Sequence, residues 1–551
     1  MIKENLVNYF ENSFKDNWEK PALSDYKGER LTYGDVAKKI ARLHILFERN
    51  GIKRGDKISL IGKNSTSWAV TYLATITYGA VIVPILPEFK PHDIHHIINH
   101  SDSILLFVGE QILDTLEIKE MPALKAIFSL IDFSVKKSND KKIVDDIHQL
   151  DSLFSDKYKN GFNPGTFRLN ATSNEDLAVI SYTSGTTGFS KGVMLAHNSL
   201  AANIRFGRNH MPLKAGDNIV SFLPLAHAYG CTFEFLFPLS LGCHVTFLTK
   251  TPSPQIITQA FDEIKPRLIL SVPLVIEKVF KKQILPVISK PVMKLLLKFP
   301  GINLILYRKI NRKLTTVFGG NFHEVIIGGA AFNAEAEAFF RKIKFPATVG
   351  YGMTECGPLI SYASWKDNKY QSSGKPVDTL AVKIDSDDPY TIVGEILVKG
   401  ENVLLGYYKN EEATKAVIDL EGWLHTGDMG IFDKEGNIYI KGRCKTMILG
   451  ASGQNIYPEE IESLLNNKFG VMESLIVDDK GKLKALIYPD YETIEAKKID
   501  AKGLEEIINY HIKEVNHQLP TYMNIAHFAL HSQEFEKTPK RSIKRFLYTA
   551  Q

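Results

Sequence analysis

The stretch LAVISYTSGTTGFSKG, residues 177–192, decides how the surrounding sequence is interpreted. Its first part, Leu177–Ile180, is a short apolar run typical of a buried strand. The part that follows is rich in hydroxyl side chains and glycine and contains one lysine, Lys191. Glycine lets backbone N–H groups turn toward an anion, hydroxyls add donors, and lysine adds positive charge. The stretch therefore favours a polyphosphate-binding loop, and a flexible surface loop is the alternative.

The bulk composition describes an ordinary globular protein. The chain has 551 residues, of which 44% are hydrophobic and 23% charged, so its length suggests three or four domain-sized units. A net charge of +5 is slight for this size and gives no argument for nucleic-acid binding. The four cysteines form no Cys-x-x-Cys pair, which indicates neither a zinc site nor a disulfide framework. They are Cys231, Cys243, Cys356 and Cys444.

We expect a cytoplasmic protein without a transmembrane helix. The first residues, MIKENLVNYFENSF, carry acids and no apolar segment of signal-peptide length. No uninterrupted apolar run reaches the roughly 18 residues that a membrane-spanning helix needs. The scattered cysteines fit a reducing compartment. Nothing in the sequence indicates an obligate protein partner.

One region breaks the charge balance. Residues 281–313 contain nine Lys or Arg residues and no Asp or Glu, interleaved with apolar groups as in the segment 292–299, VMKLLLKF. Such a pattern suits the surface of an anionic membrane, which makes contact with the inner face of the membrane one hypothesis. A core-facing helix with a solvated basic face is the alternative.

Apolar runs alternate with helical patterns through the first part of the chain, and this indicates an α/β fold with crossover connections. Continuous apolar runs suit strands that are buried on both faces of a parallel sheet. The strand-like runs are 57–61, 80–85, 104–108 and 267–270, and the helical patterns include 35–47 and 65–77. The region 135–160 is the most polar and is predicted to be a mobile excursion.

From about Gln371 onward, short strands and turns replace this pattern, as in the run Gly394–Val398. The glycine-punctuated stretch 442–453 suits a hinge, and Pro458 marks a helix start, because proline is favoured in the first turn. We therefore divide the chain into a large N-terminal part with several subdomains, residues 1–444, and a smaller mobile α+β domain, residues 445–551. A C-terminal unit of about a hundred residues is a common domain size.

The segment YTSGTTGFSKG, residues 182–192, closely resembles the phosphate loop of the adenylate-forming enzymes. This superfamily includes acyl- and aryl-CoA synthetases, firefly luciferase and peptide-synthetase adenylation domains. Four further motifs resemble those of the family and occur in its order. They are GYGMTE at 350–355, GWLHTGD at 422–428, KGRCK at 441–445 and GQNIYPEEIE at 453–462. The resemblance covers nearly the whole chain and is strongest to the long-chain acyl-CoA synthetases.

The resemblance implies that ATP, Mg²⁺ and coenzyme A bind here. Glu355 would bind Mg²⁺, Asp428 would accept hydrogen bonds from the ribose, and Arg443 would reach the phosphates. Lys445 occupies the family's hinge position. The phosphate loop and the residues beside the nucleotide would be Thr183, Ser184, Gly185, Thr186, Thr187, Gly188, Lys191, Gly329, Ala330, Ala331, Tyr351, Gly352, Met353 and Thr354. The residues expected to act in catalysis are Lys191, His227, Thr354, Glu355, Arg443 and Lys540.

The resemblance also implies a medium- or long-chain fatty acid as substrate. His227, in the segment FLPLAHAYG at 222–230, corresponds to the position that lines the acyl pocket in the family. Peptide-synthetase domains place an Asp near this segment, and none is present here. Coenzyme A is expected to enter near residues 450–457. A carrier-protein phosphopantetheine is the alternative acceptor.

The C-terminal motif departs from the family pattern, in which a lysine bridges the attacking carboxylate and the α-phosphate. Thr538, Ile543 and Arg545 register with that motif, which puts Ser542 at the lysine position. Loss of this charge could cost a hundredfold or more in rate, on the order of several kcal/mol. We hypothesise that Lys540 is the substitute. Lys544, Arg541 or a protein with weak adenylation are the alternatives.

Overall fold

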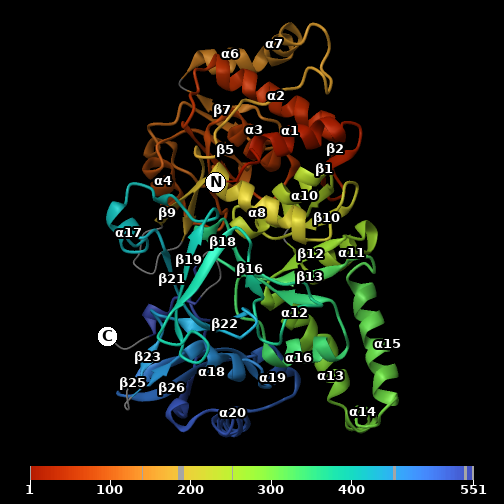
Figure 1. Cartoon of the computed structure of the whole chain (residues 1–551), viewed down its shortest axis with the longest axis vertical. Helices are drawn as coiled ribbons and strands as arrows, with labels where there is room; N and C mark the ends of the chain where they lie inside the picture. The colour runs from red at the N-terminus through yellow and green to blue at the C-terminus, as the bar shows by residue number, and fades with distance from the viewer. Residues whose placement is uncertain are drawn as a thin grey trace.

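A computed structural model describes residues 2–138, 140–183, 191–250, 252–450, 454–538 and 543–548. Figure 1 shows an elongated molecule, with the N-terminal residues in its upper part and the C-terminal residues, in blue, at its lower end. Helices and mixed sheets alternate along the chain, which confirms the α/β fold class.

The largest sheet has eight strands, and its middle strands run parallel. The expected parallel-type sheet is therefore confirmed at its centre, whereas β7, β9 and β20 pair antiparallel at its two edges. The strands, in spatial order, are β20 (Gly406–Tyr407), β9 (Lys191–Ala196), β8 (Leu177–Thr183), β4 (Val81–Ile85), β3 (Lys57–Ile61), β5 (Ser103–Val108), β6 (Ala126–Ser129) and β7 (Val135–Ser138).

Local sequence signals set the helices that cover this sheet. Thr32 and Asp35 form a capping box at the start of α2 (Tyr33–Arg49), which satisfies two free N–H groups. Ser65 caps α3 (Thr66–Tyr78), and Gly79 ends it with a positive φ of 94°. Twelve residues of α3 are buried, from Thr66 to Thr77, because α3 packs between the sheet and α2. Further helices of this part are α1 (Leu6–Asp16), α4 (Pro91–His100), α5 (Glu110–Leu113) and α8 (His197–His210).

The prediction for the region 135–160 is wrong. This region is not an irregular excursion, because it forms β7, α6 (Lys141–His148) and α7 (Leu150–Lys157). Ile143 and Phe154 are buried, and the buried Asp146 accepts a hydrogen bond from Arg49 Nε at 2.7 Å. A few apolar contacts with α2 therefore order a segment whose overall composition is polar.

Three smaller sheets and a set of helices connect the large sheet to the C-terminal part. The sheets are β10 (Asn218–Ser221), β11 (His244–Phe247), β1 (Pro21–Asp25) and β2 (Arg30–Thr32); the parallel β12 (Leu268–Ser271), β13 (Glu324–Ile327) and β14 (Ala347–Val349); and β15 (Tyr351–Gly352), β16 (Leu359–Tyr362) and β17 (Lys375–Pro376). The helices are α9 (Ala228–Gly230), the π-helix η2 (Cys231–Leu236), α10 (Phe237–Leu241), α11 (Pro254–Ile264), α12 (Pro273–Val279), the π-helix η3 (Phe280–Ile284), α13 (Leu285–Ile288), α14 (Pro291–Leu296), α15 (Ile302–Val317) and α16 (Ala334–Lys342).

The expected strand-rich subdomain is an antiparallel sheet. Its strands are β18 (Leu380–Asp385), β19 (Gly394–Gly400), β21 (Leu424–Phe432) and β22 (Ile438–Arg443), and α17 spans Glu411–Lys415. Helix α17 lies in the connection between strands β19 and β21. Strands β21 and β22 carry Asp428 and Arg443 opposite each other.

The C-terminal residues build a second apolar core, which runs from Ile456 to Ile525 and is separate from the main core. It lies between helices and a sheet of three strands, of which β26 and β27 are parallel. The elements are β23 (Ile448–Leu449), β24 (Asn455–Ile456), α18 (Pro458–Leu465), β25 (Val471–Asp479), β26 (Lys482–Pro489), α19 (Tyr491–Ala496), α20 (Ala501–Asn516) and β27 (Ile525–Leu530). A separate core is consistent with a division near residue 445, which stays a prediction. Across the described residues, no helix combines the length and apolarity required to cross a membrane.

Candidate functional site

The predicted phosphate loop connects β8 to β9, which pair as antiparallel neighbours. Thr183 pairs with Lys191 at its base, and the Thr183 hydroxyl donates to Lys191 O at 3.5 Å. Gly192 follows under the side chains of Ile180 and Tyr182, and a Cβ there would lie 2.9 Å from Ile180 Cγ2. The predicted residues Ser184, Gly185, Thr186, Thr187 and Gly188 lie outside the described residues. The two strands therefore hold both ends of the loop in a fixed, closely packed frame.

A hydrogen bond from the buried Tyr182 connects the end of β8 to the last turn of α4. Tyr182 O–H lies 2.7 Å from His100 Nδ1, at the end of α4. Burial raises the pKa of Tyr182, and burial lowers the pKa of His100, so both groups stay neutral near pH 7. The sequence offered no signal for this pair, because the two residues are 82 positions apart.

Lys191 and Glu355 are brought together through a residue that the sequence analysis missed. Lys191 Nζ lies 4.9 Å from the ring centre of Tyr407, and the Tyr407 hydroxyl donates to Glu355 Oε1 at 3.0 Å. Strand β20, which carries Tyr407, pairs with β9, which carries Lys191. Burial and the Glu355 carboxylate raise the pKa of Tyr407, which keeps its proton on the hydroxyl as a donor. We call Lys191, Tyr407 and Glu355 the phosphate-side cluster.

The GYGMTE motif folds as β15 and the 3₁₀-turn Thr354–Cys356. Gly352 is required by close packing, because a Cβ there would meet Pro358 O at 2.1 Å. The main chain of Glu355 is fixed as well, since its carbonyl accepts from Leu404 N–H at 2.8 Å. Met353 and Thr354 are half-buried beside it. This turn holds the Glu355 carboxylate against Tyr407 while leaving it partly open to solvent.

Asp428 is the centre of a second group, the ribose-side cluster. The Tyr351 hydroxyl donates to Asp428 Oδ2 at 2.8 Å, and Arg443 Nε donates to Oδ1 at 3.0 Å. The Asp428 side chain is only 8% exposed, whereas that of Arg443 is 69% exposed. Burial raises the pKa of Asp428, and Arg443 and Tyr351 oppose this shift. Three residues from three separate sequence motifs therefore meet, and their roles toward a nucleotide stay a prediction.

The predicted adenine loop follows β13. Gly329 has a positive φ of 89°, which glycine adopts without strain, and Ala330 and Ala331 are exposed. Gly328 lies against the ring of Tyr229, and a Cβ there would approach Tyr229 Cζ to 3.1 Å. Beyond the loop, Asn333 N–H donates to Glu277 Oε1 on α12 at 3.1 Å. The loop is thus exposed at its tip and held at both ends.

His227 lies immediately before α9, at the end of a segment that is fixed by two buried polar side chains. Asn64 donates to Leu223 O at 2.7 Å and accepts from Leu225 N–H at 3.0 Å. Glu234, on the π-helix η2, accepts from Ser221 Oγ, Phe222 N–H and Leu223 N–H at 2.9 to 3.1 Å. Neither Asn64 nor Glu234 was predicted. A buried acid inside an apolar run would have been the only sequence signal.

The predicted hinge lies where β22 ends. Gly442 packs under the ring of Tyr457, because a Cβ at Gly442 would lie 2.8 Å from Tyr457 Cδ1. Lys445 is exposed. The next residue, Thr446, donates to Glu459 Oε1 on α18 at 2.6 Å. The chain on both sides of Lys445 therefore contacts the first turn of α18.

The C-terminal tail is tied to α18 by Arg545. Arg545 pairs with Glu462 and, at 3.5 Å, with Glu459. Burial raises the pKa of Glu462 to about 7, against the opposing effect of Arg545. Lys544 Nζ lies 2.5 Å from Glu536 Oε1, so this lysine is already paired. Lys540, Arg541 and Ser542 lie outside the described residues, and the hypothesis on Lys540 stays a prediction.

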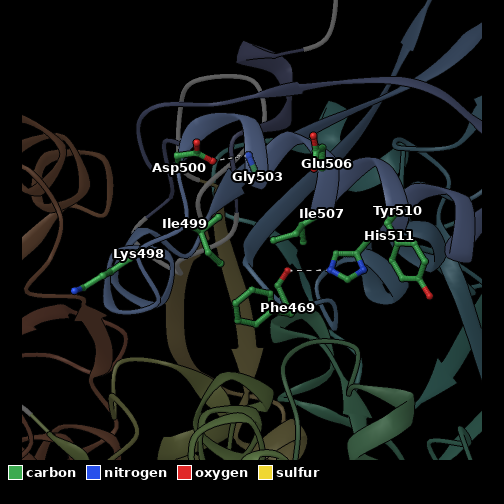
Figure 2. Close-up of a pocket in the computed structure, with 9 residues that line it drawn as sticks. All are labelled: Phe469, Lys498, Ile499, Asp500, Gly503, Glu506, Ile507, Tyr510 and His511. Carbon is green, nitrogen blue, oxygen red and sulfur yellow. Dashed lines mark hydrogen bonds between the residues drawn. The ribbon is translucent and has the colours of Figure 1, made fainter.

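A groove on the C-terminal part contains none of the predicted site residues. It has a volume of about 640 Å³ and is lined by one side of α20 and by the two loops before it. Figure 2 shows the His511 ring turned toward the carbonyl of Phe469, and the Asp500 carboxylate accepting a hydrogen bond from Gly503 N–H. The groove is open, and its Asp500 and His511 side chains make hydrogen bonds within the C-terminal part. We do not assign it to the nucleotide site.

The residues present fit a magnesium ion that is held largely by phosphate. Glu355 offers a partly open carboxylate, and among the described residues its hydrogen-bond donor is Tyr407, which donates to Oε1. In the described part of the chain, no group of three or more His, Cys, Asp or Glu side chains could hold a metal by itself. One carboxylate is sufficient for Mg²⁺, because this ion keeps several waters and binds substrate phosphates.

Comparison with known proteins agrees with this geometry. The sequence model of the family described as "AMP-binding enzyme" matches residues 10–408. The chain belongs to the AMP-binding enzyme family. Among curated relatives, the long-chain-fatty-acid–CoA ligase FadD15 of Mycobacterium bovis is 28% identical over 494 residues, 85% of this chain and 78% of its own. A long-chain-fatty-acid–CoA ligase of Salmonella typhimurium is 27% identical over 502 residues, which are 85% of this chain and 82% of the relative.

Solved structures of this enzyme family share the fold. The anthranilate CoA ligase AuaEII, in complex with anthranoyl-AMP, superposes with a TM-score of 0.77 at 20% identity, over 99% of this chain and 96% of its own. ATP-bound MatB from Rhodopseudomonas palustris gives a TM-score of 0.76 at 22% identity, over 99% of this chain and 98% of its own. The fold is therefore that of adenylate-forming enzymes from end to end.

Proposed function

We propose that this AMP-binding enzyme is an ATP-dependent acid–CoA ligase that acts on medium- or long-chain fatty acids. The observation that carries the proposal is the pair of clusters described above, one built on Asp428 and the other on Glu355. A carboxylate that is held by Tyr351 and Arg443 suits ribose hydroxyls, and Lys191 with Glu355 suits a magnesium-bound phosphate tail. The names of the curated relatives support a long acyl chain.

The proposed reaction has two steps. First, a fatty-acid carboxylate oxygen attacks the α-phosphorus of ATP, which forms the acyl-adenylate and breaks the bond to pyrophosphate. The coenzyme A thiolate then attacks the acyl carbonyl carbon, which forms the thioester and releases AMP. When bound, Mg²⁺ would neutralise phosphate charge beside Glu355. The protein places the reactants and supplies fixed positive charge through Lys191 and Arg443.

An apolar acid fits the segment before His227 better than an amino acid does. The carboxylate nearest in sequence, Glu234, is fully buried, and three donors of residues 221–223 occupy its Oε2. It is therefore turned toward the main chain and is not offered to a substrate ammonium group. Burying an amino group without a partner would be costly, whereas a hydrocarbon chain needs none.

A pyrophosphate-release screen tests this proposal. The purified chain is given ATP, Mg²⁺ and acids of increasing length, with coenzyme A, with a phosphopantetheine-bearing carrier protein, or with neither. We expect AMP formation that needs both a long acid and coenzyme A. A requirement for the carrier protein would identify the alternative acceptor. ATP binding without turnover would indicate a homologue with impaired adenylation, and no ATP binding would overturn the proposal.

Lys540→Ala tests which group replaces the usual C-terminal lysine. If Lys540 supplies the missing charge, we expect the rate of pyrophosphate release with palmitate to fall about a hundredfold. Lys544→Ala is the matched control, because Lys544 pairs with Glu536 and should leave the rate nearly unchanged. An unchanged rate in Lys540→Ala would show that Lys540 has no such role.

A further inference from the structure

A helical hairpin, formed by α13, α14 and α15, stands at the edge of the molecule. Figure 1 shows α15 running along the right side and α14 at the lower right corner. Helices α13 and α14 bury no residue, and of the 16 residues of α15 only Leu314 is buried. We call residues 285–313 the edge hairpin.

The tip of the edge hairpin exposes large apolar side chains. Val292 is 70% exposed and Ile305 is 67% exposed, although both are side chains that a globular protein normally buries. Together the exposed members form a contiguous stretch of chain rather than scattered single residues. They are Val287, Val292, Leu295, Phe299, Ile302, Leu304 and Ile305. Apolar exposure of this kind marks an interaction site.

The same hairpin is uniformly basic. No Asp or Glu occurs between residues 281 and 313. Seven of its Lys and Arg side chains are exposed, and within the described ranges none of the seven makes an ion pair. They are Lys290, Lys294, Lys298, Arg308, Lys309, Arg312 and Lys313. The charge is therefore free to attract an external anion.

The order of these residues along α15 suits a membrane interface. Its first turns carry Ile302, Leu304 and Ile305, and the basic pairs 308–309 and 312–313 follow. With a rise of about 1.5 Å per residue, the basic pairs begin roughly 5 Å above the apolar residues. An interfacial helix buries its apolar side about 5–10 Å into the headgroup region, which would leave these basic groups among the phosphates.

The stem of the hairpin is anchored, so the tip projects from a fixed base. Asn311 Nδ2 donates to Ile343 O at 2.9 Å and to Lys344 O at 3.1 Å, just beyond α16. The ring of Tyr307 lies edge-on to that of Phe339, with centres 6.4 Å apart. By helical spacing, both anchors lie on the side of α15 opposite to Ile302 and Ile305.

We propose that the edge hairpin docks the protein on the surface of an anionic phospholipid membrane. Charge complementarity decides between the candidate partners. A second copy of this chain would bring the same seven positive charges to the contact, and a self-complementary contact would place like charges together. A lipid bilayer offers both an acyl layer for the apolar tip and phosphates for the basic residues. This proposal does not depend on the acyl-CoA ligase activity, since vesicle binding is measured without substrates.

Sedimentation of the full chain with vesicles tests the proposal. We expect binding to phosphatidylcholine vesicles that contain phosphatidylglycerol, weaker binding to pure phosphatidylcholine, and loss of binding at high salt. The variant K294Q/K298Q/R308Q/K309Q should bind at least about tenfold more weakly, since each basic residue near the surface contributes about fivefold. The matched control, K53Q/K119Q/K125Q/K434Q, removes the same charge from exposed lysines elsewhere and should bind like the unmodified chain.

The apolar tip is tested separately by V292S/L295S/I305S. We expect this variant to lose vesicle binding and to keep the oligomeric state and the ATP affinity of the unmodified chain. Equal losses in the control and in K294Q/K298Q/R308Q/K309Q would overturn the proposal, because net charge alone would then explain binding. A dimer that V292S/L295S/I305S dissociates, without vesicle binding by the unmodified chain, would overturn it in favour of a contact between copies.

Discussion

At the scale of single residues, Asp428 joins two kinds of partner that no local pattern connects. Its carboxylate is buried between the neutral Tyr351 hydroxyl and the exposed Arg443 guanidinium. A buried carboxylate is costly without such partners, so the two donors offset part of the cost of burying it. Arg443 is the more exposed of the two partners, because most of its side chain is in solvent.

Asp428→Asn tests the ribose-side cluster. This change removes the charge and one acceptor while keeping the size of the side chain. We expect the Kd for ATP to rise about 10- to 100-fold, since a hydrogen bond to a charged group contributes roughly 1.5–3 kcal/mol. Calorimetric titration measures the affinity. Asp388→Asn, on an exposed turn, is the control, and an equal affinity in both variants would contradict the assignment of Asp428.

Tyr407→Phe tests the phosphate-side cluster. It removes the donor to Glu355 and keeps the ring beside Lys191. We expect kcat to fall about fivefold to tenfold, since one net hydrogen bond contributes about 1 kcal/mol, and we expect half-maximal activity to need more Mg²⁺. The control is Tyr408→Phe, because the hydroxyl of the neighbouring Tyr408 donates to Asp102. A change in thermal stability without any change in the Mg²⁺ dependence would mean that Tyr407 is only structural.

At the scale of elements, the π-helix η2 supports the segment before His227, and its apolar sequence does not indicate this role. It brings the fully buried Glu234 against the main chain of residues 221–223, which leads to His227. Burial raises the pKa of Glu234 well above its usual range, and the hydrogen bonds from Ser221, Leu223 and Phe222 oppose this shift. One side chain thus sets the course of the strand end and of the turn that follows it.

Glu234→Ala should destabilise the fold by about 3 kcal/mol or more, because three buried donors lose their acceptor. Glu234→Gln keeps an acceptor of the same size, and we expect it to cost less than half as much. Urea denaturation followed by tryptophan fluorescence measures both free energies of unfolding. Equal losses in the two variants would show that charge matters here and that hydrogen bonding does not.

Sequence patterns predicted elements well where apolar periodicity was strong, as in β3, β4, α2 and α3. They failed at residues 135–160, because burial of Ile143 and Phe154 against α2 depends on contacts that no local window contains. The site divides in the same way. Motif residues such as Asp428 and Glu355 could be named in advance. Tyr407, which donates to Glu355, and His100, which bonds to Tyr182, could not be named, because only the folded chain brings these distant residues together. The same holds for the supports Asn64 and Glu234.

At the scale of the whole molecule, two buried histidines and one half-buried histidine should make stability depend on pH. Burial lowers the pKa of His44, His197 and His244 from 6.5 to about 4. Below pH 6.5 the unfolded chain takes up protons at these positions, and the folded chain does so only near pH 4. The free energy of unfolding should therefore fall as the pH drops from 6.5 to 4, by roughly 3 kcal/mol for each histidine.

His197→Leu isolates one of these contributions, because both ring nitrogens of His197 lack a hydrogen-bond partner in the described part of the chain. From pH 7 to pH 4, the free energy of unfolding of the unmodified chain should fall by about 3 kcal/mol more than that of this variant. His517→Leu, at an exposed position, serves as the control. A difference that is the same at every pH would show that His197 does not titrate in this range.

Lys281, at the base of the edge hairpin, contacts the C-terminal part directly. Its ammonium group donates to Asn466 O, and burial lowers its pKa. If the C-terminal part rotates between the two half-reactions, this amine must become accessible to solvent. Lys281 is therefore a built-in reporter: an acylating reagent, followed by mass spectrometry, would label it slowly in one arrangement and quickly in the other. The rate of that labelling, measured with ATP alone and then with coenzyme A, would give the timing of the domain movement without any engineered probe.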